Sequence, residues 1–316
     1  MPQPNVVIRL ILPLCLLAIL VAGCKQNAGV ASNGKPVKWV PYNEKSTLAD
    51  QALRARLKVE RREALTNTLT DTGEVWFASE VVLYNAYGLQ TLAQEMDQAG
   101  TIVKETRNDY RDSLIVRQAV TEGSGYSSAI EFTYNDKNQK VGELLFQRGD
   151  SVLRRSYKVD AVGNETEVAL QRFRDGSRFE LVTERDDLGR PAKVREMQGG
   201  KANWSEVYTL SDSLWRIQRS DSLGKLQSDY EMRFDASGAI ARMVNRTPDG
   251  KTRLQVEYVN DKHGRPLKES FFGANGQQFQ TYEYLYNNEG LLMERRLSTP
   301  NQPFVLITKY TYSFRR

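Results

Sequence analysis

The sequence predicts a mainly β protein, in which a short N-terminal helix precedes a long up-and-down antiparallel meander of about 16 strands. A four-residue turn motif, with Asn, Asp or Ser three residues before Gly or Asn, recurs about every 25 residues. A second series of glycine turns lies between these motifs, so each period holds two strands. Residues before the motifs alternate between apolar and polar, which is typical of an antiparallel sheet covered on one face.

Residues 1–23 have the organisation of a signal peptide. They carry one charged side chain, Arg9, followed by the 13-residue apolar run Leu10–Ala22. Crossing a bilayer takes about 20 apolar residues, so this run is too short to span one and has the length of a signal-peptide core. The sequence therefore predicts an exported protein.

The segment Leu20-Val-Ala-Gly-Cys24 resembles a bacterial lipobox. The resemblance implies that Cys24 becomes the first residue of the mature protein and carries acyl chains such as palmitate, which anchor it stably to a membrane. The alternative is that Cys24 is incidental at the end of an ordinary signal peptide. Because Lys25 replaces the Asp that favours inner-membrane retention in similar lipoproteins, we expect an outer-membrane lipoprotein facing the periplasm, with surface exposure as the other option.

Residues 24–47 are expected to form a flexible basic tether. From 24 to 70 the chain has nine Lys or Arg and four Asp or Glu, whereas residues 71–316 have a net charge of −1. The excess positive charge therefore lies beside the anchor, where it either contacts anionic headgroups or is simply solvated. It predicts no nucleic-acid surface.

Residues 48–70 are predicted to form a short helix or an irregular segment. Ala49, Leu53, Leu57 and Ala64 recur at roughly helical spacing, which favours a helix from about 48 to 65. The alternation in Leu57-Lys-Val59 equally fits the start of a strand pair.

Residues 71–316 are predicted to be the β-repeat domain. The Asp or Asn that opens each turn motif can accept backbone hydrogen bonds, and the Gly or Asn three residues later tolerates a positive φ, so each motif is expected to be a hairpin turn. The motifs begin at Asn85, Asn135, Asp160, Asp186, Asp235, Asp261 and Asn287, with degenerate copies at Ser211 and near Tyr110.

Aromatic side chains at alternate positions before the turns share one face of the predicted strands. The candidate ligand-facing residues are Phe132, Tyr134, Tyr230, Phe234, Tyr258, Tyr282, Tyr284 and Tyr286. They form either a surface that binds a lipid or a glycan, or the packed core of the sheet. A flat sheet of 16 strands would be roughly 75 Å wide and could not cover its apolar face, so we expect a curled or spiral sheet.

The repeats resemble the YD-repeat family, which is related to the Rhs proteins. The closest copies are Tyr157-Lys-Val-Asp160, Met232-Arg-Phe-Asp235 and Tyr284-Leu-Tyr286-Asn287 with the glycines that follow them. The resemblance implies a long β-spiral, and it does not extend to a C-terminal toxic domain.

The chain offers few groups for catalysis. His263 is the only histidine and lies inside a predicted turn, so we interpret it as an exposed turn residue and not as a base. The turn aspartates lack the clustered spacing of a calcium site, which indicates hydrogen-bonded turns and no bound metal. We expect no cofactor and no enzymatic activity.

Two functions remain. The first is an envelope-anchored structural or interaction scaffold, whose repeat surface contacts an envelope protein. The alternative is a binding or carrier module that takes a lipid or glycan on its aromatic concave face.

Overall fold

The computed structural model describes residues 42–70, 73–300, 302 and 304–316. In these ranges the chain forms one helix, α1 (Tyr42–Arg56), followed by 20 strands. The strands are β1 (Val59–Thr70), β2 (Gly73–Tyr84), β3 (Gln90–Met96), β4 (Ile102–Arg111), β5 (Leu114–Glu122), β6 (Ser127–Tyr134), β7 (Lys140–Gln147), β8 (Asp150–Val159), β9 (Glu165–Arg172), β10 (Arg178–Arg185), β11 (Pro191–Gln198), β12 (Lys201–Leu210), β13 (Leu214–Asp221), β14 (Leu226–Phe234), β15 (Ile240–Arg246), β16 (Thr252–Asn260), β17 (Pro266–Phe272), β18 (Gln278–Tyr286), β19 (Leu292–Ser298) and β20 (Leu306–Phe314).

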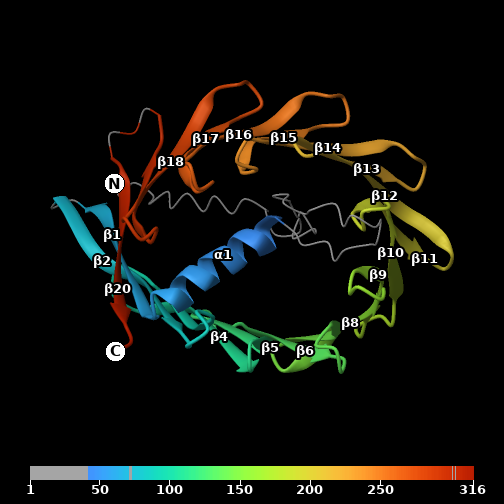
Figure 1. Ribbon diagram of the computed structural model, residues 1–316, viewed down its shortest axis with the longest axis horizontal. Helices are drawn as coiled ribbons and strands as arrows, with labels where there is room; N and C mark the ends of the chain where they lie inside the picture. The colour runs from blue at the N-terminus through green and yellow to red at the C-terminus, as the bar shows by residue number, and fades with distance from the viewer. Residues whose placement is uncertain (1–41, 71–72, 301, 303) are drawn as a thin grey trace, which may run out of the picture.

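The strands form a closed antiparallel barrel (Figure 1). Each strand pairs with the next one along the chain, and β1 also pairs with β20 from Val59↔Phe314 to Thr66↔Thr308. The prediction of a mainly β chain with one short helix is confirmed. The prediction of a curled or spiral sheet of about 16 strands is wrong, because the first and last strands join and the sheet has no free edge.

The predicted number of strands was too low because three parts of the sequence contain strands without a clear turn motif. The segment 48–70, predicted to be helical or irregular, contains β1. The 50 residues between the motifs at Asn85 and Asn135 hold four strands, with a turn at Asp112 that lacks the Gly or Asn. The final strand β20 is followed by no turn motif. Strands without their own turn signal were therefore missed.

The helix lies earlier than predicted. Instead of 48–65 it covers 42–56, so Ala49 and Leu53 belong to it, whereas Ala64 lies in β1. Lys58 adopts a φ of 54° and turns the chain directly from the helix into β1, as the strand alternative at Leu57-Lys-Val59 allowed. Residues 42–47, predicted as tether, begin the helix; the signal peptide, Cys24 and the tether up to residue 41 lie outside the described residues.

The predicted hairpin turns are present at the sequence motifs. In the first, the Gly88 amide donates to the Asn85 carbonyl oxygen at 3.0 Å, while the Asn85 Oδ1 accepts from the amides of Tyr87 and Leu89 at 3.0 and 3.1 Å. The same pattern recurs at Asp160 and Asp261. Consecutive strands are antiparallel, so every second turn lies at the same end of the barrel. All the motifs therefore lie at one rim, which we call the motif rim.

Helix α1 lies inside the ring of strands and rests on the motif rim (Figure 1). The Gln51 Nε2 donates to the Tyr87 carbonyl at 3.2 Å, and the Arg54 Nε donates to the Gly88 carbonyl at 3.1 Å. Leu53 and Leu57 pack on a cluster that contains the fully buried Val59 and Val82. Gly88 allows this contact, because a Cβ built on it would lie 2.3 Å from the Gln51 carbonyl oxygen.

Substituting Gly88 tests how the helix is held. Gly88 and Gly250 have similar φ values of 69° and 81°, but a Cβ on Gly250 would meet nothing within 4 Å. Both Gly88→Ala and Gly250→Ala therefore carry the cost of a left-handed alanine, about 1 kcal/mol, and only Gly88→Ala also clashes with α1. We expect Gly88→Ala to lower the free energy of unfolding by about 1–3 kcal/mol more than Gly250→Ala in urea denaturation. Equal losses in the two variants would contradict this docking of α1.

Candidate ligand-binding lumen

The inner face of the barrel is defined by the residues that surround α1. Arg62, Tyr84 and Tyr312 line a cavity together with helix residues, and Arg62 pairs with Tyr312 across the β1–β20 seam. Because residues paired on neighbouring strands share a face, the register carries this assignment around the whole barrel. A barrel of this strand number is too wide for side chains to fill, so it encloses a lumen.

All eight aromatic residues predicted to face a ligand lie on the inner face. Tyr258 and Glu269 line the cavity and pair with each other. Glu269 also pairs with Tyr282 on the next strand, so Tyr282 shares their inner face. Tyr230 pairs with Ile217 on the opposite wall. The remaining members are Phe132, Tyr134, Phe234, Tyr284 and Tyr286. The structure places them in one lumen without bringing them together at one point, and their role toward a ligand stays a prediction.

An apolar strip runs along the inner face from β11 to β15. It is built from two packed clusters that share Leu210 and Tyr230. The rings of Trp215 and Phe234 meet edge to face with centroids 5.3 Å apart. The members of this apolar strip are Val194, Trp204, Tyr208, Leu210, Trp215, Ile217, Tyr230, Met232, Phe234, Ile240 and Met243.

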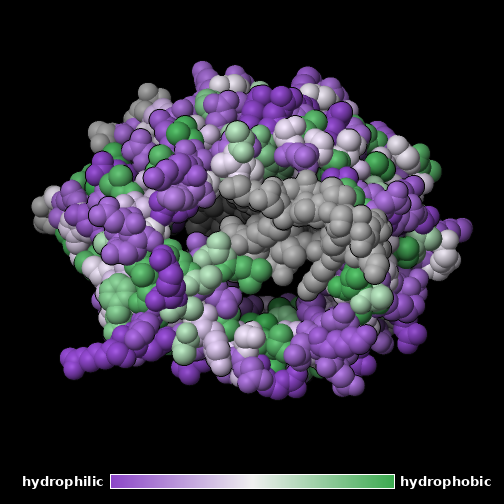
Figure 2. Space-filling model, in the orientation of Figure 1, coloured by the Kyte–Doolittle hydropathy of each residue, from purple (hydrophilic) through white to green (hydrophobic). Residues whose placement is uncertain are grey.

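The outer face carries charged side chains in pairs across neighbouring strands. Arg216 and Asp229 form two hydrogen bonds of 2.9 and 2.6 Å, and Lys158 lies 2.8 Å from Glu167. Figure 2 shows a mainly hydrophilic surface that is hollowed at its centre, with hydrophobic side chains visible at the hollow. The outer face therefore carries ion pairs, and the inner face carries the apolar strip together with charged side chains such as Arg62 and Glu206.

Several inner tyrosines are fixed along the wall by a repeated hydrogen bond. The Tyr134 hydroxyl donates to the Ile115 carbonyl at 2.8 Å, and the Tyr312 hydroxyl donates to the Leu292 carbonyl at the same distance. Tyr110 makes the equivalent bond to Gln90. Each tyrosine ends a strand at the motif rim and reaches the first residues of a strand about 20 positions earlier in the chain. The rings therefore lie along the wall.

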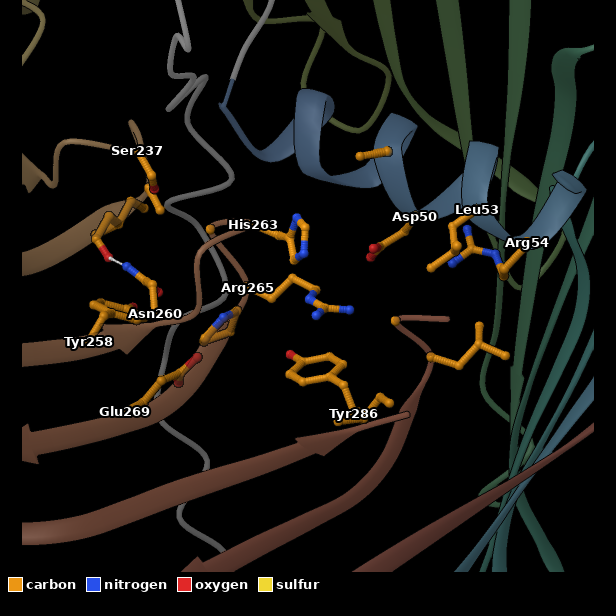
Figure 3. Close-up of a pocket in the computed structure, with 18 of the residues that line it drawn as sticks. Asp50, Leu53, Arg54, Ser237, Tyr258, Asn260, His263, Arg265, Glu269 and Tyr286 are labelled. Atoms are coloured by element: carbon orange, nitrogen blue, oxygen red, sulfur yellow. Dashed lines mark hydrogen bonds between the residues drawn. The ribbon is translucent and has the colours of Figure 1, made fainter. Parts of the chain in front are cut away.

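The main cavity lies between α1 and the inner wall and has a volume of about 570 Å³ (Figure 3). The helix contributes Asp50, Leu53 and Arg54. The wall contributes residues from both sides of the seam and from the β14–β19 hairpins: Arg62, Tyr84, Ile240, Tyr258, Asn260, His263, Arg265, Glu269, Tyr286, Leu291, Leu292 and Tyr312.

Three arginines in this cavity are each stacked on a tyrosine ring. The guanidinium carbon of Arg54 lies 4.9 Å from the centre of the Tyr84 ring. Arg62 lies 5.3 Å from the Tyr310 ring, and Arg265 lies 4.7 Å from the Tyr286 ring. Such stacking holds a guanidinium group in a fixed plane.

Two of these arginines already have carboxylate partners. Arg62 contacts both Glu80 oxygens at 2.8 Å, and Arg265 contacts Asp261 at 2.6 and 2.7 Å. The Nε of Arg54, in contrast, donates to a backbone carbonyl. Asp50 lies on the side of α1 that faces Arg265 (Figure 3), and enclosure in the barrel raises its pKa while Arg54, Arg62 and Arg265 act to lower it.

Other inner carboxylates are paired with tyrosines. The Tyr208 hydroxyl donates to Glu206 at 2.8 Å, and Arg219 lies 3.9 Å away. Glu206 is only 3% exposed, and this burial raises its pKa. Burial also raises the pKa of Glu269, whose partner is Tyr284. Among the described residues, no group of three His, Cys, Asp or Glu side chains could hold a metal ion.

Sequence reasoning found the aromatic wall and missed the arginine cluster. Arg54, Arg62 and Arg265 come from the helix, the first strand and a hairpin turn, and only closure of the barrel brings them together. A faint signal was available in α1, where Asp50, Leu53 and Arg54 share one helix face. His263 is an exposed turn residue, as predicted, and it lies at the margin of the cavity.

The chain matches no known protein family, and no curated protein matches it. Among solved structures it is similar to a porin-like protein from Bacteroides uniformis ATCC 8492, with 11% identity, coverage of 81% of this chain and 98% of that one, and a TM-score of 0.38. A LolA superfamily protein from Nitrosomonas europaea aligns with 10% identity, over 86% and 93% of the two chains, with a TM-score of 0.21. The TcdB2-TccC3 structure aligns with 11% identity and a TM-score of 0.28, over 76% of this chain and 17% of that one. These similarities are too weak to indicate a function.

No described helix has the length and apolar character that crossing a bilayer requires.

The buried Glu206 gives a prediction for pH dependence. Its raised pKa means that the folded protein binds the proton more tightly than the unfolded chain does, so its contribution to stability is greatest below the unfolded pKa of about 4.3 and falls as the pH rises through the folded pKa. We expect Glu206→Gln to increase stability relative to the wild type more at pH 7 than at pH 4, measured by urea denaturation at both values. The outward Glu184→Gln, at a half-exposed ion pair with Arg195, is the control and should show little such difference.

Proposed function

We propose that this chain is a carrier or binding protein that holds an apolar or amphipathic small molecule, most simply a lipid, in the lumen of its barrel. The observation that carries the proposal is the distribution of side chains across the wall: the apolar strip faces the lumen, and ion pairs such as Arg216–Asp229 face outward. A wall that crosses a bilayer has the opposite arrangement, with an apolar band facing the lipid. The outward charges therefore favour a barrel whose outside is in water and whose inside binds the ligand.

Several properties of the lumen suit a lipid better than a glycan. The apolar strip contains Met232, Ile217 and Trp215, and the hydroxyls of Tyr208 and Tyr230 within it already donate to Glu206 and to the Met243 sulfur. Burying a ligand methylene against such a surface contributes about 0.8 kcal/mol, so an acyl chain gains affinity along its length. The cavity of about 570 Å³ is in the range of small-molecule sites.

Attachment to the envelope is part of the proposal. Acylation at Cys24 would hold the barrel at a membrane surface through the segment that leads into α1, and the expected site is the periplasmic side of the outer membrane. The proposal involves no enzymatic step and no cofactor.

The binding function is tested with a paired substitution. Met243 lies in the apolar strip, and its sulfur accepts a hydrogen bond from the Tyr230 hydroxyl at 2.9 Å. Gln is similar in size to Met and keeps a hydrogen-bond acceptor. Val207 is 45% exposed on the outer face of β12, whose inner face contributes Tyr208 to the strip, and it serves as the control. We expect Met243→Gln to weaken binding of the fluorescent fatty acid cis-parinaric acid about three- to tenfold, or about 1 kcal/mol, and Val207→Gln to leave it unchanged.

Fluorescence titration of the acyl-free protein measures this affinity, and native mass spectrometry of protein isolated from cells shows any retained ligand. If the probe does not bind saturably, or if the two variants lose affinity equally, the lumen is not the binding site.

A second function, the interaction scaffold, is supported by an apolar patch on the outside of β1 and β2. Its members are exposed by 38 to 60%: Leu65, Leu69 and Trp76. Trp76 lies under Lys309, with the ammonium nitrogen 4.7 Å from the ring centre. Such a patch beside a charged wall is typical of a protein contact.

A photo-crosslinking residue placed at Trp76 is expected to give one adduct of defined mass in intact cells, whereas the same residue placed at Arg195 on the outer face of β11 is expected to give none. Equal labelling at both positions would contradict a specific contact at the patch.

A further inference from the structure

We infer that Arg54, Arg62 and Arg265 form a recognition site for the anionic headgroup of a single-chain amphiphile, and that Asp50 of α1 occupies this site as an internal anion until the ligand displaces it. This inference rests on the proposed carrier function and specifies its ligand and the orientation in which the ligand binds. The headgroup chemistry is a carboxylate or a phosphate.

The three arginines are held in fixed positions beside one cavity. Each guanidinium is held against a tyrosine ring at 4.7 to 5.3 Å, so its plane is fixed before a ligand arrives. The Nε of Arg62 is buried without a hydrogen-bond partner among the described residues. An unpartnered buried donor is costly, and an additional acceptor beside it would remove that cost.

Charge balance in the cluster indicates a singly charged headgroup. Glu80 pairs with Arg62 and Asp261 pairs with Arg265, whereas Asp50 lies four residues before Arg54 on α1 and lines the same cavity, which makes it the carboxylate that balances Arg54. Glu269, the other carboxylate of the cavity, is paired with Tyr284 and influenced by Arg295, outside this cluster. When Asp50 moves away, one positive charge is left uncompensated, and one ligand carboxylate restores the balance.

The cavity leads from the arginines to the apolar strip. Leu53, Leu291 and Leu292 line the cavity beside the arginines. Ile240 both lines this cavity and packs against the cluster of Trp215, Met232 and Phe234. An amphiphile whose headgroup binds at the arginines can therefore extend its chain past Ile240 along the apolar strip.

Helix α1 is suited to yield to a ligand. Its side-chain contacts with the wall include two hydrogen bonds to carbonyls, from Gln51 and Arg54, the stacking of Arg54 on Tyr84, and the packing of Leu53 and Leu57. Displacing Asp50 by a small shift of the helix does not disturb any pairing between strands.

The test compares two probes of equal chain length, dodecanoate and dodecanol, on the full mature chain at pH 8. Asp50→Asn removes the competing carboxylate, so we expect dodecanoate to bind about three- to tenfold more tightly and dodecanol to bind as before. Arg54→Gln is expected to weaken dodecanoate by a similar factor and to leave dodecanol unchanged. The control is Glu63→Gln, which removes a half-exposed carboxylate on the outside of β1.

The outcomes separate this inference from the proposed function. If neither probe binds, the carrier function itself is wrong. If both probes bind but Asp50→Asn and Arg54→Gln change them equally, or if Glu63→Gln reproduces the effect of Asp50→Asn, the lumen binds ligands without a headgroup site at the arginines. Circular dichroism confirms folding, and Asp50→Ser replaces Asp50→Asn if that variant is unfolded. Dodecyl phosphate, measured in parallel, shows which of the two headgroups is preferred.

Discussion

The structure depends on the pairing between β1 and β20. These strands lie at opposite ends of the repeat array, and their ladder runs from Val59↔Phe314 to Thr66↔Thr308. Beyond the ladder, the Asn67 side chain continues the contact by accepting from the Ile307 amide and donating to the Val305 carbonyl. At the other end Arg315 donates to the carbonyls of Val59 and Tyr84. An open sheet of 20 strands would expose two rows of unpaired backbone groups, and closure removes both.

Closure also creates the difference between inside and outside on which the proposed function rests. In an open sheet the alternation of side chains distinguishes only two faces, whereas in a barrel one face encloses a lumen and the other meets the surroundings. The helix that precedes β1 turns into the barrel at Lys58 and carries Asp50 and Arg54 to the inner face of the seam. The cavity is thus a product of where the chain enters the barrel, and its charged residues come from segments that are adjacent only after closure.

Much of the local structure could be predicted from the sequence. The turn motifs at Asn85, Asp160 and Asp261 act through hydrogen bonds within five residues, so their chemistry is visible in the sequence itself. The shared face of Tyr282, Tyr284 and Tyr286 follows from alternation alone. Closure and the arginine cluster could not be predicted, because they depend on the total twist of the sheet and on pairings about 250 residues apart, for which a single sequence carries no local signal. Strands such as β1 and β20, which lack a turn motif, were missed for the same reason.

The seam between β1 and β20 differs from every other strand pair in how the chain must form it. Nineteen of the pairings join neighbours in the sequence and can form one hairpin at a time, whereas this one requires the two ends of the array to meet. Chain-entropy considerations place such an event late in folding, after most of the wall exists. Until then the folding chain is a curved sheet with two unpaired edge strands, β1 and β20, and each can pair with a second molecule in place of its own partner. By pairing with β1, strand β20 prevents domain-swapped assemblies, and a chain that ended before Leu306 would leave the edge of β1 unpaired.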